Sequence, residues 1–367
     1  MIFLISGKFT VFYAIFSFSI RNCPAVFLFH AFLPGYDTDI CIMKLIACIM
    51  CFLMSPACVV FSAGTDSLLA VFWNLENFFD FTDGGGGSSD REFSPEGERR
   101  WTGGRYWRKC HSVAKSIIWI SEKYGRVPDV MGFAEVENGS VLRSVIYGTA
   151  LKKYGYVQIH ADSPDPRGID VALVYRKRLF RCAGWKTFPV SADMDGNRMA
   201  TRDILYVCLE GSDEDRYHFL VNHHPSKYGG AAATAGKRIA AMNVMLHVCD
   251  SLSAAGENNI VCMGDFNDNP DGEALGLAGK RLVNLGKDLH ERGEGTIRFS
   301  GKWDLIDMFL VSRDMESSAV MEICFPGFLA VRDNTCSGMK PLRTYTGPRY
   351  SGGISDHLPI IMIVKKD

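Results

Sequence analysis

Acidic, carboxamide and imidazole side chains recur at the ends of apolar stretches of this sequence. Stretches such as "VFWNLEN", "FLVNHH" and "IVCMGDFND" run from apolar residues directly into polar ones. The polar residues at these ends are Asn74, Glu76, Glu135, Asn222, His223, Asp265, Asn267, Asp307, Asp356 and His357. A single acid at the end of a strand is commonplace, but this repeated set predicts that several strand ends converge on one pocket.

The composition of this set indicates phosphoryl chemistry. Carboxylate and carboxamide oxygens are hard ligands, which suit Mg²⁺, and also Mn²⁺ or Ca²⁺, better than Zn²⁺. The sequence contains no HExxH or comparable spacing that would indicate a zinc site on a helix. A hard cation that holds a phosphate, with an imidazole that handles the proton of an attacking water, fits these side chains.

The last of these polar pairs, Asp356 and His357, precedes the apolar run "LPIIMIV" near the C-terminus. The run is typical of a buried strand because it is short and rich in Ile. An acid and an imidazole at its start are costly to bury unless they are paired or bound to something. The alternative is a surface turn with a capping Asp and an unrelated His.

Apolar strands and amphipathic helices must position these groups. Strands are predicted in "LLAVFWNLENFF", "PDVMGFAEVEN", "IDVALVYRK", "RDILYVCLEG", "RYHFLVNHH", "NNIVCMGDFND", "DLIDMFLVS" and "HLPIIMIV", and long helices in "YWRKCHSVAKSIIWISEKYG" and "TAGKRIAAMNVMLHVCDSLSAAG". Strands that follow one another without a helix imply hairpins rather than a doubly wound parallel sheet. We therefore predict an α/β fold with two mixed, mainly antiparallel sheets packed face to face and helices outside.

Residues 1–64 are predicted to be an N-terminal extension and a signal peptide, followed by one catalytic domain over 65–367. From Met43, the stretch "MKLIACIMCFLMSPACVVFSAG" has a basic start, an apolar core and small residues before Gly64, which is typical of a secretory signal. We expect Met43 to be the true start and the protein to be exported, to the periplasm or outside the cell, without stable membrane insertion. The alternatives are a lipoprotein site at Cys58 and a retained membrane anchor.

The charge balance excludes a polycation that binds nucleic acid through bulk charge. The chain has 40 basic and 41 acidic residues, a net charge of −1. A nucleic-acid partner would therefore need a local basic groove. Candidates for such a groove are Arg99, Arg100, Arg105, Arg108, Lys109, Lys340, Arg343 and Arg349. The alternative is that these cations form an ordinary solvated face, and we expect a monomer.

Seven motifs carry a resemblance to a known family. In chain order they are "NLEN", "AEVEN", "RGIDVALVYR", "NHHPSK", "GDFND", "WDLIDMFLVS" and "SDHLP". From about Leu69 to Val364 the sequence resembles the endonuclease/exonuclease/phosphatase superfamily, to which pancreatic deoxyribonuclease is related, and its exported bacterial members in particular. The resemblance implies a four-layer α/β sandwich. His224 departs from the pattern, because those members carry Trp or Phe there.

The resemblance also implies a metal site formed by Asn74, Glu76, Glu135 and Asp356. Glu135 would be the main ligand of Mg²⁺, with Asn74 beside it and Asp356 sharing the ion. Glu76 has an alternative role, as a hydrogen-bond partner that only supports Asn74.

The catalytic residues implied by the resemblance are His223, Asp265, Asn267, Asp307 and His357. Asp265 and Asn267 would orient the attacking water and the phosphate, and His223 would donate to a non-bridging phosphate oxygen. His357, steered by Asp307, would be the general base or a phosphate contact. Whether His357 or Asp265 takes the proton of the water stays open.

Three further residues are predicted to bind substrate: Arg167, Asn222 and Arg202. Arg167 has the alternative of bracing its own loop, and Arg202 has the same ambiguity, although an Arg on a strand near a phosphate is a reasonable clamp.

The predicted function is that of an exported, Mg²⁺-dependent phosphoesterase that cleaves phosphodiester bonds, as a nuclease does, by in-line attack of water. The first alternative is a phosphomonoesterase that acts on a sugar, inositol or lipid-headgroup phosphate. The second alternative is a catalytically inactive protein that binds a phosphorylated ligand, which would be expected to lack one or more of the core groups.

Overall fold

The computed structural model describes residues 2–6, 9–20, 23–31, 67–84, 88–190, 200–212 and 215–365. The chain divides into two units, Met1–Gly64 and Thr65–Asp367. In the first unit, β1 (Ile2–Ser6), β2 (Phe9–Ile20) and β3 (Cys23–Ala31) form an antiparallel sheet. The predicted signal peptide, from Met43 to Gly64, lies outside the described residues.

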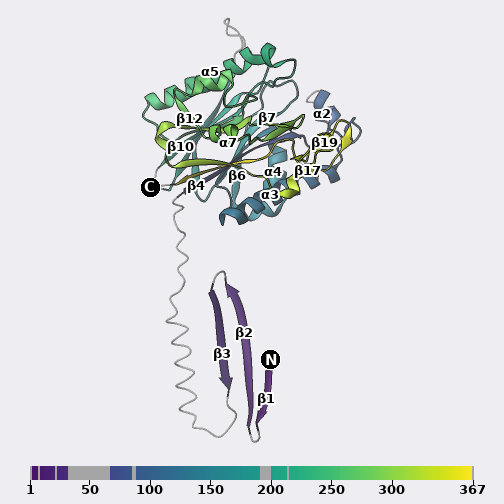
Figure 1. The fold of residues 1–367 in the computed structure, drawn as a ribbon, viewed down its shortest axis with the longest axis vertical. Coiled ribbons are helices and arrows are strands. Elements are labelled where there is room, and N and C mark those ends of the chain that lie inside the picture. Colours follow the sequence, from purple (N-terminus) through teal and green to yellow (C-terminus); the bar gives the residue numbers. More distant parts are fainter. Residues whose placement is uncertain are drawn as a thin grey trace. The chain divides into compact units, whose positions relative to one another are not determined.

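Two six-stranded sheets form the second unit (Figure 1). The first, which we call the β4 sheet, has the order β16 (Ala319–Ile323), β21 (Ile360–Lys365), β4 (Ser67–Phe78), β5 (Val130–Val136), β7 (Asp170–Arg176) and β6 (Tyr156–His160). The second, the β10 sheet, has the order β12 (Leu282–Asn284), β15 (Asp307–Ser312), β11 (Ile260–Asp265), β10 (Arg216–His223), β9 (Ile204–Gly211) and β8 (Phe180–Phe188).

Helices and short ladders complete the second unit. The helices are α2 (Ser88–Glu92), α3 (Gly103–Tyr124), α4 (Gly139–Tyr147), α5 (Ala231–Ala254), α6 (Glu273–Ala278) and α7 (Lys287–Glu291), with 3₁₀ turns η1 (Ala150–Tyr154), η2 (Arg313–Met315) and η3 (Gly327–Leu329). The ladders pair β13 (Ile297–Phe299) with β14 (Lys302–Asp304), β17 (Ala330–Arg332) with β18 (Met339–Pro341), and β19 (Tyr345–Thr346) with β20 (Arg349–Tyr350). Among the helices of the described part, none is both long and apolar enough to cross a bilayer.

Strand alternation in β4 creates the layers. Ala70 and Phe72 join the core that β4 shares with the β10 sheet, whereas Val71 and Trp73 join a second core with α3. Successive side chains of a strand point to opposite faces, so a strand that is apolar at every position must be covered on both sides. Helix α5 covers the other face of the β10 sheet, opposite the side on which α3 lies (Figure 1). The predicted four-layer sandwich is confirmed.

Sheet pairing brings the polar strand ends to one edge. Strands β4 and β5 pair in parallel, as do β10 and β11, while the other pairs within the two sheets are antiparallel. In the β10 sheet, Asp265 lies directly opposite His223 on one side and Asp307 on the other. Because parallel strands end at the same edge, their terminal side chains meet there.

Gly264, one residue before Asp265, offers a test of this packing. An added Cβ would lie 2.4 Å from the backbone oxygen of Asn222 on β10, so Gly264→Ala should destabilise the fold by about 1–3 kcal/mol. Gly236→Ala is the control, because a Cβ at this exposed position of α5 would meet nothing within 4 Å among the described residues. It should stabilise the fold by about 0.5–1 kcal/mol. Urea unfolding measures both, and equal midpoints would contradict the prediction.

Candidate active site

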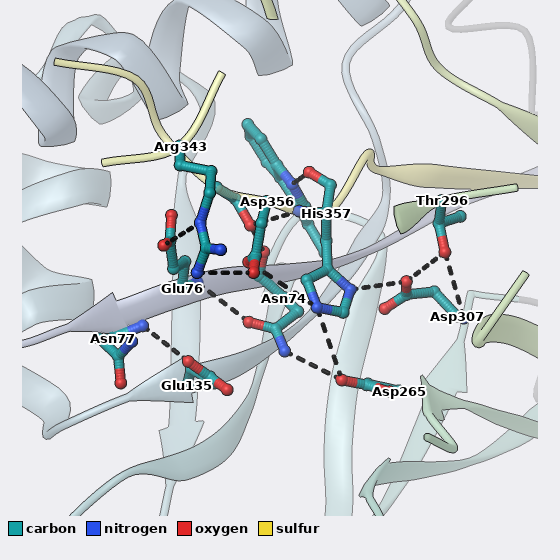
Figure 2. Close-up of polar contacts among 12 residues, drawn as sticks. Asn74, Glu76, Asn77, Glu135, Asp265, Thr296, Asp307, Arg343, Asp356 and His357 are labelled. Carbon is teal, nitrogen blue, oxygen red and sulfur yellow. Dashed lines mark hydrogen bonds and ion pairs between the residues drawn. The ribbon is translucent and has the colours of Figure 1, made fainter. Parts of the chain in front are cut away.

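The polar strand ends converge in one cluster (Figure 2). Asn74 comes from β4, Glu135 from β5, Asp265 from β11 and Asp307 from β15, while His357 lies just before β21. Asn74 Nδ2 donates to Asp265 Oδ2 at 3.0 Å, which joins the two sheets directly. The structure therefore brings together residues that are separated by almost the whole second unit.

Strained backbone shapes this cluster. The sheet register shifts at the ends of β4 and β5. There Glu76 (φ 47°), Asn77 (φ 46°) and Glu135 (φ 58°) adopt the left-handed conformation, which is uncommon for residues other than glycine and often marks functional sites. Hydrogen bonds hold these turns, since Asn74 Oδ1 accepts from Glu76 N at 2.9 Å and Glu135 Oε2 accepts from Asn77 N at 2.7 Å.

His357 is held from several sides. Its Nδ1 lies 2.8 Å from Asp307 Oδ2, and its backbone oxygen accepts a 2.9 Å hydrogen bond from Trp73 Nε1. Thr296 Oγ1 donates to the same Asp307 oxygen. A carboxylate at Nδ1 fixes the imidazole orientation and places the proton on that nitrogen. His357 Nε2 therefore faces the cluster, 3.9 Å from Asp265 Oδ2.

The electrostatics of His357 and Asp265 are linked. Burial alone would lower the pKa of His357, but Asp307, Asp265 and Asp356 together raise this pKa well above its ordinary value. Burial and the neighbouring Asp307 raise the pKa of Asp265 to about 7. The cluster thus holds a cationic imidazole next to a carboxylate that can take up a proton near neutrality.

Asn267 and His223 lie around Asp265. Asn267 (φ 50°) donates its backbone N–H to Asp265 Oδ1 at 2.9 Å and its side-chain Nδ2 to the backbone oxygen of His224. His223 Nε2 lies 3.6 Å from Asp265 Oδ2 and 3.8 Å from Glu135 Oε1. Burial, with the positive charge of Arg202, lowers the pKa of His223 well below its ordinary value. His223 is therefore neutral.

Arg343 bridges two acids of the predicted metal site. Its Nε donates to Glu76 Oε1 at 2.9 Å, and its Nη2 lies 3.0 Å from Asp356 Oδ2 (Figure 2). The other carboxylate oxygen of Glu76 accepts from Thr344 N at 2.9 Å. Burial and Asp356 raise the pKa of Glu76 to about 7. Both oxygens of Glu76 thus anchor the segment of Arg343 and Thr344, and only its backbone N–H contacts Asn74.

Lys109 belongs to the interior and not to a basic groove. Its side chain is buried on α3, and Nζ donates to Glu76 O at 2.7 Å and to Thr344 Oγ1 at 2.9 Å. Burial lowers the pKa of Lys109 to about 8. The groove prediction is wrong for this residue. The sequence contained a sign of this burial: Lys109 lies four residues before Val113 and therefore on the apolar face of α3.

The three predicted substrate contacts differ in exposure. Arg167 is 41% exposed at its side chain, and its Nη1 lies 3.6 Å from Glu135 Oε1. Arg202 is buried, with Nη1 donating to Asp165 Oδ2 at 2.7 Å. Asn222 is also buried and donates to the backbone oxygen of Leu220. Only Arg167 of the three combines exposure with a position beside the acids.

The donor set fits a hard divalent cation. Carboxylate and carboxamide oxygens of Glu135, Asn74 and Asp356 lie around the same hydrogen-bonded cluster (Figure 2). In the same cluster, the ligand atoms of Asp265, Asp307 and His357 lie within 4.8 Å of one another. Asp307 Oδ1 in this group is buried and has no hydrogen-bond partner among the described residues. Mg²⁺ is typically held by one or two carboxylates, with water and substrate phosphate as its other ligands.

His224, which departs from the family pattern, predicts a pH effect. It is buried with its ring against Phe266, and burial, with Arg202 and Arg238, lowers its pKa to about 3. Between pH 6.5, the ordinary pKa of histidine, and about pH 3, the imidazole of His224 is protonated in the unfolded state but not in the folded state. The free energy of unfolding therefore falls as the pH falls. From pH 6.5 to about pH 5 the loss is about 2 kcal/mol.

His224→Phe should remove this loss, because an apolar ring has no proton to take up. Urea unfolding at both pH values measures the difference between the variant and the wild type, and replacing the exposed His247 of α5 with Phe is the control. An acid slope as steep in His224→Phe as in the wild type would contradict the prediction.

Solved structures share this fold. The catalytic domain of human Nocturnin, solved with a bound sulfate anion, matches with a TM-score of 0.51 at 16% identity, covering 82% of this chain and 94% of that one. An endonuclease/exonuclease/phosphatase family protein from Bacteroides thetaiotaomicron matches with a TM-score of 0.52 at 16% identity, covering 82% and 98%. A protein of the same description from Bacteroides vulgatus gives 0.50 at 14% identity, covering 82% and 99%.

A search of curated protein sequences finds no match. The sequence profile of the Endonuclease/Exonuclease/phosphatase family, in contrast, matches residues 69–366. This span includes every residue of the cluster described above. The chain therefore belongs to the endonuclease/exonuclease/phosphatase family.

Proposed function

We propose that this protein hydrolyses phosphate esters with the help of a divalent cation, most simply Mg²⁺. The family consists of phosphoesterases and nucleases. The observation that carries the proposal is the geometry of His357, whose Nδ1 is fixed by Asp307 while Nε2 faces Asp265 and Asp356 at 3.9 and 3.8 Å. A phosphate between these groups would meet a donor and a proton acceptor together.

The side chains divide the work of hydrolysis. His357, kept cationic by the carboxylates around it, donates its Nε2–H to a phosphate oxygen and stabilises the charge that develops there. Asp265 accepts the proton of the attacking water, and Asn267 and Asn74 hold its carboxylate in place. As the water oxygen bonds to phosphorus, the bond from phosphorus to the alcohol oxygen breaks, and the alcohol leaves with a proton from the solvent. His223 is neutral and donates a hydrogen bond to a second phosphate oxygen. Arg202 does not contact the phosphate. It holds Asp165, which lies beside Arg167.

Glu135, Asn74 and Asp356 would hold the cation. When bound, the ion neutralises phosphate charge and orients the ester. Arg343 keeps Asp356 in position through its 3.0 Å ion pair, and Glu76 in turn holds Arg343. Lys109 lies beneath Glu76 and offsets part of the negative charge that these acids bring together.

Phosphodiesters are the first candidate substrates. The support is the resemblance to deoxyribonuclease-like proteins and the exposure of Arg100, Arg108 and Arg349. Exposed cations of this kind contact a nucleic-acid backbone.

Small phosphate monoesters are the second candidate substrates. The observation that favours them is that several cations of the predicted basic groove already form ion pairs with acids of the protein. Arg99 pairs with Glu92 at 2.6 Å, Lys340 pairs with Asp333 at 3.1 Å, and Arg343 pairs with acids of the site. Cations already paired within the protein contribute less to binding a long polyanion, whereas a single phosphate needs only the local donors.

An ester panel tests the proposal. We expect hydrolysis of bis(p-nitrophenyl) phosphate and nicking of plasmid DNA if diesters are the substrates, or release of phosphate from p-nitrophenyl phosphate if monoesters are. Either activity should require Mg²⁺ and be lost in EDTA. Failure on every ester with Mg²⁺, Mn²⁺ and Ca²⁺ would contradict the proposed function and favour a protein that only binds phosphorylated ligands.

A further inference from the structure

A cavity of about 490 Å³ opens where the edges of both sheets meet the start of α4. One wall comes from β6, the edge strand of the β4 sheet, and another from β8, the edge strand of the β10 sheet. This volume lies within the range of about 300–1,000 Å³ that small-molecule sites occupy. None of the residues predicted from the sequence to act in catalysis lines it.

An exposed tryptophan forms the apolar part of the lining. Trp185 of β8 is 49% exposed, although side chains of this size are on average highly buried. Ile159 of β6 is the other apolar side chain of the lining. The cavity thus offers one flat aromatic surface, and its remaining walls are polar.

The polar walls contain an unused hydrogen-bond acceptor. Gln158 Nε2 donates to Gly139 O at 2.8 Å, but its buried Oε1 has no hydrogen-bond partner within the described part of the chain. Next to it on β6, the His160 side chain is 8% exposed, with Nδ1 3.8 Å from Asp162 Oδ1. The carboxylate of Asp162, whose side chain is 91% exposed, is an acceptor that a ligand hydroxyl can reach.

The start of α4 keeps the cavity open and supplies a cation. A Cβ at Gly139 would lie 3.1 Å from Gln158 Nε2 and 3.4 Å from Arg143 Nη1, so a larger residue would crowd this wall. Arg143 is exposed and donates through Nη2 to Ser140 Oγ at 2.6 Å. Donors and acceptors therefore line the same cavity as Trp185.

We propose that this cavity binds the cyclic polyol part of a phosphate ester, a sugar or inositol ring, and this inference rests on the proposed function. A polyol ring has an apolar C–H face, which packs on Trp185, and hydroxyl groups that both donate and accept, which suit Gln158, Asp162 and Arg143.

The cavity borders two segments that lead to residues beside the catalytic cluster. Asn138, which lines it, follows Glu135 by three residues, a span of at most about 11 Å along the chain. The loop that leaves β6 at the cavity also carries Arg167, whose Nη1 lies 3.6 Å from Glu135 Oε1. The cavity therefore adjoins the segments that carry Glu135 and Arg167, and the proposal places the phosphate of a bound ring on that side.

Kinetics of a Trp185 variant test this inference. Trp185→Ala should raise KM for glucose 6-phosphate, mannose 6-phosphate and inositol 1-phosphate by about 10- to 100-fold, the usual effect of losing apolar contact with one large side chain. Its kcat should change little, and p-nitrophenyl phosphate, which lacks a polyol, should be unaffected. Trp185→Phe should keep most of the affinity. Trp107→Phe is the control, because Trp107 has similar exposure but lies outside the cavity.

A binding measurement separates this inference from the proposed function. Saturation-transfer NMR with inositol, methyl glucoside and methyl mannoside, which carry no phosphate, should give a signal with the wild-type chain and none with Trp185→Ala. Polyol binding without ester hydrolysis would support the cavity and contradict the proposed function. Hydrolysis of p-nitrophenyl phosphate without polyol binding, or an equal KM effect on all esters, would overturn the cavity assignment.

Discussion

Replacing His357 with alanine should lower kcat by about 10²- to 10³-fold, the usual cost of removing one donor to the charge that develops in the transition state. The side chain places its Nε2 between Asp265 and Asp356, and no other imidazole of the described chain is paired with Asp307. The loss should appear in kcat on diesters and monoesters alike, because both present a phosphate to the same groups.

A second substitution separates catalysis from folding in this experiment. His357→Asn keeps an N–H near the position of Nδ1 for Asp307 but removes Nε2, so it should be as inactive as His357→Ala and more stable in urea. His290→Ala, on the partly exposed α7, is the control and should retain full activity. Activity within a few-fold of wild type in His357→Asn would remove the proposed role.

Glu135→Gln should lower kcat/KM by about 10²- to 10³-fold at a fixed, low Mg²⁺ concentration, as the loss of one strong electrostatic contact does. The amide oxygen can still accept from Asn77 N, so the turn at the end of β5 should persist. The lost charge should weaken cation binding, and part of the activity should return as the Mg²⁺ concentration rises.

The neighbouring Glu137 provides a matched control for this substitution. It lies two residues further along the chain and accepts from Asp80 N at 2.7 Å. Glu137→Gln should therefore leave the Mg²⁺ dependence unchanged. If Glu135→Gln and wild type show the same activity at every Mg²⁺ concentration, Glu135 is not the main ligand.

The layered fold could be predicted because its signals are local. Strands such as β4 are apolar at consecutive positions, and the helix α3 shows an apolar face with 3.6-residue spacing. The clustering of Asn74, Asp265 and His357 followed from the same pattern, since each lies at the end of an apolar strand. Sequence order alone could not give the sheet order that places Asp265 opposite both His223 and Asp307.

The contacts among the supporting residues were not predicted, because their partners are distant in sequence. Arg343 lies 267 positions from Glu76, and Thr344 lies 235 positions from Lys109. The turns at Glu76 and Glu135 were also missed, because a simple alternation of side chains along a strand contains no sign of a register shift. Export, cleavage near Gly64 and the monomeric state stay predictions from the sequence.

Cation binding tests the central claim most directly, because the claim is that residues from Asn74 to His357 meet around one divalent ion. Calorimetric titration with Mn²⁺ should show one ion bound per wild-type chain, a much weaker site in Glu135→Gln, and ester hydrolysis that rises with the bound ion and vanishes in EDTA. Full hydrolysis in excess EDTA, or Mn²⁺ binding that is identical in the two proteins, would contradict it.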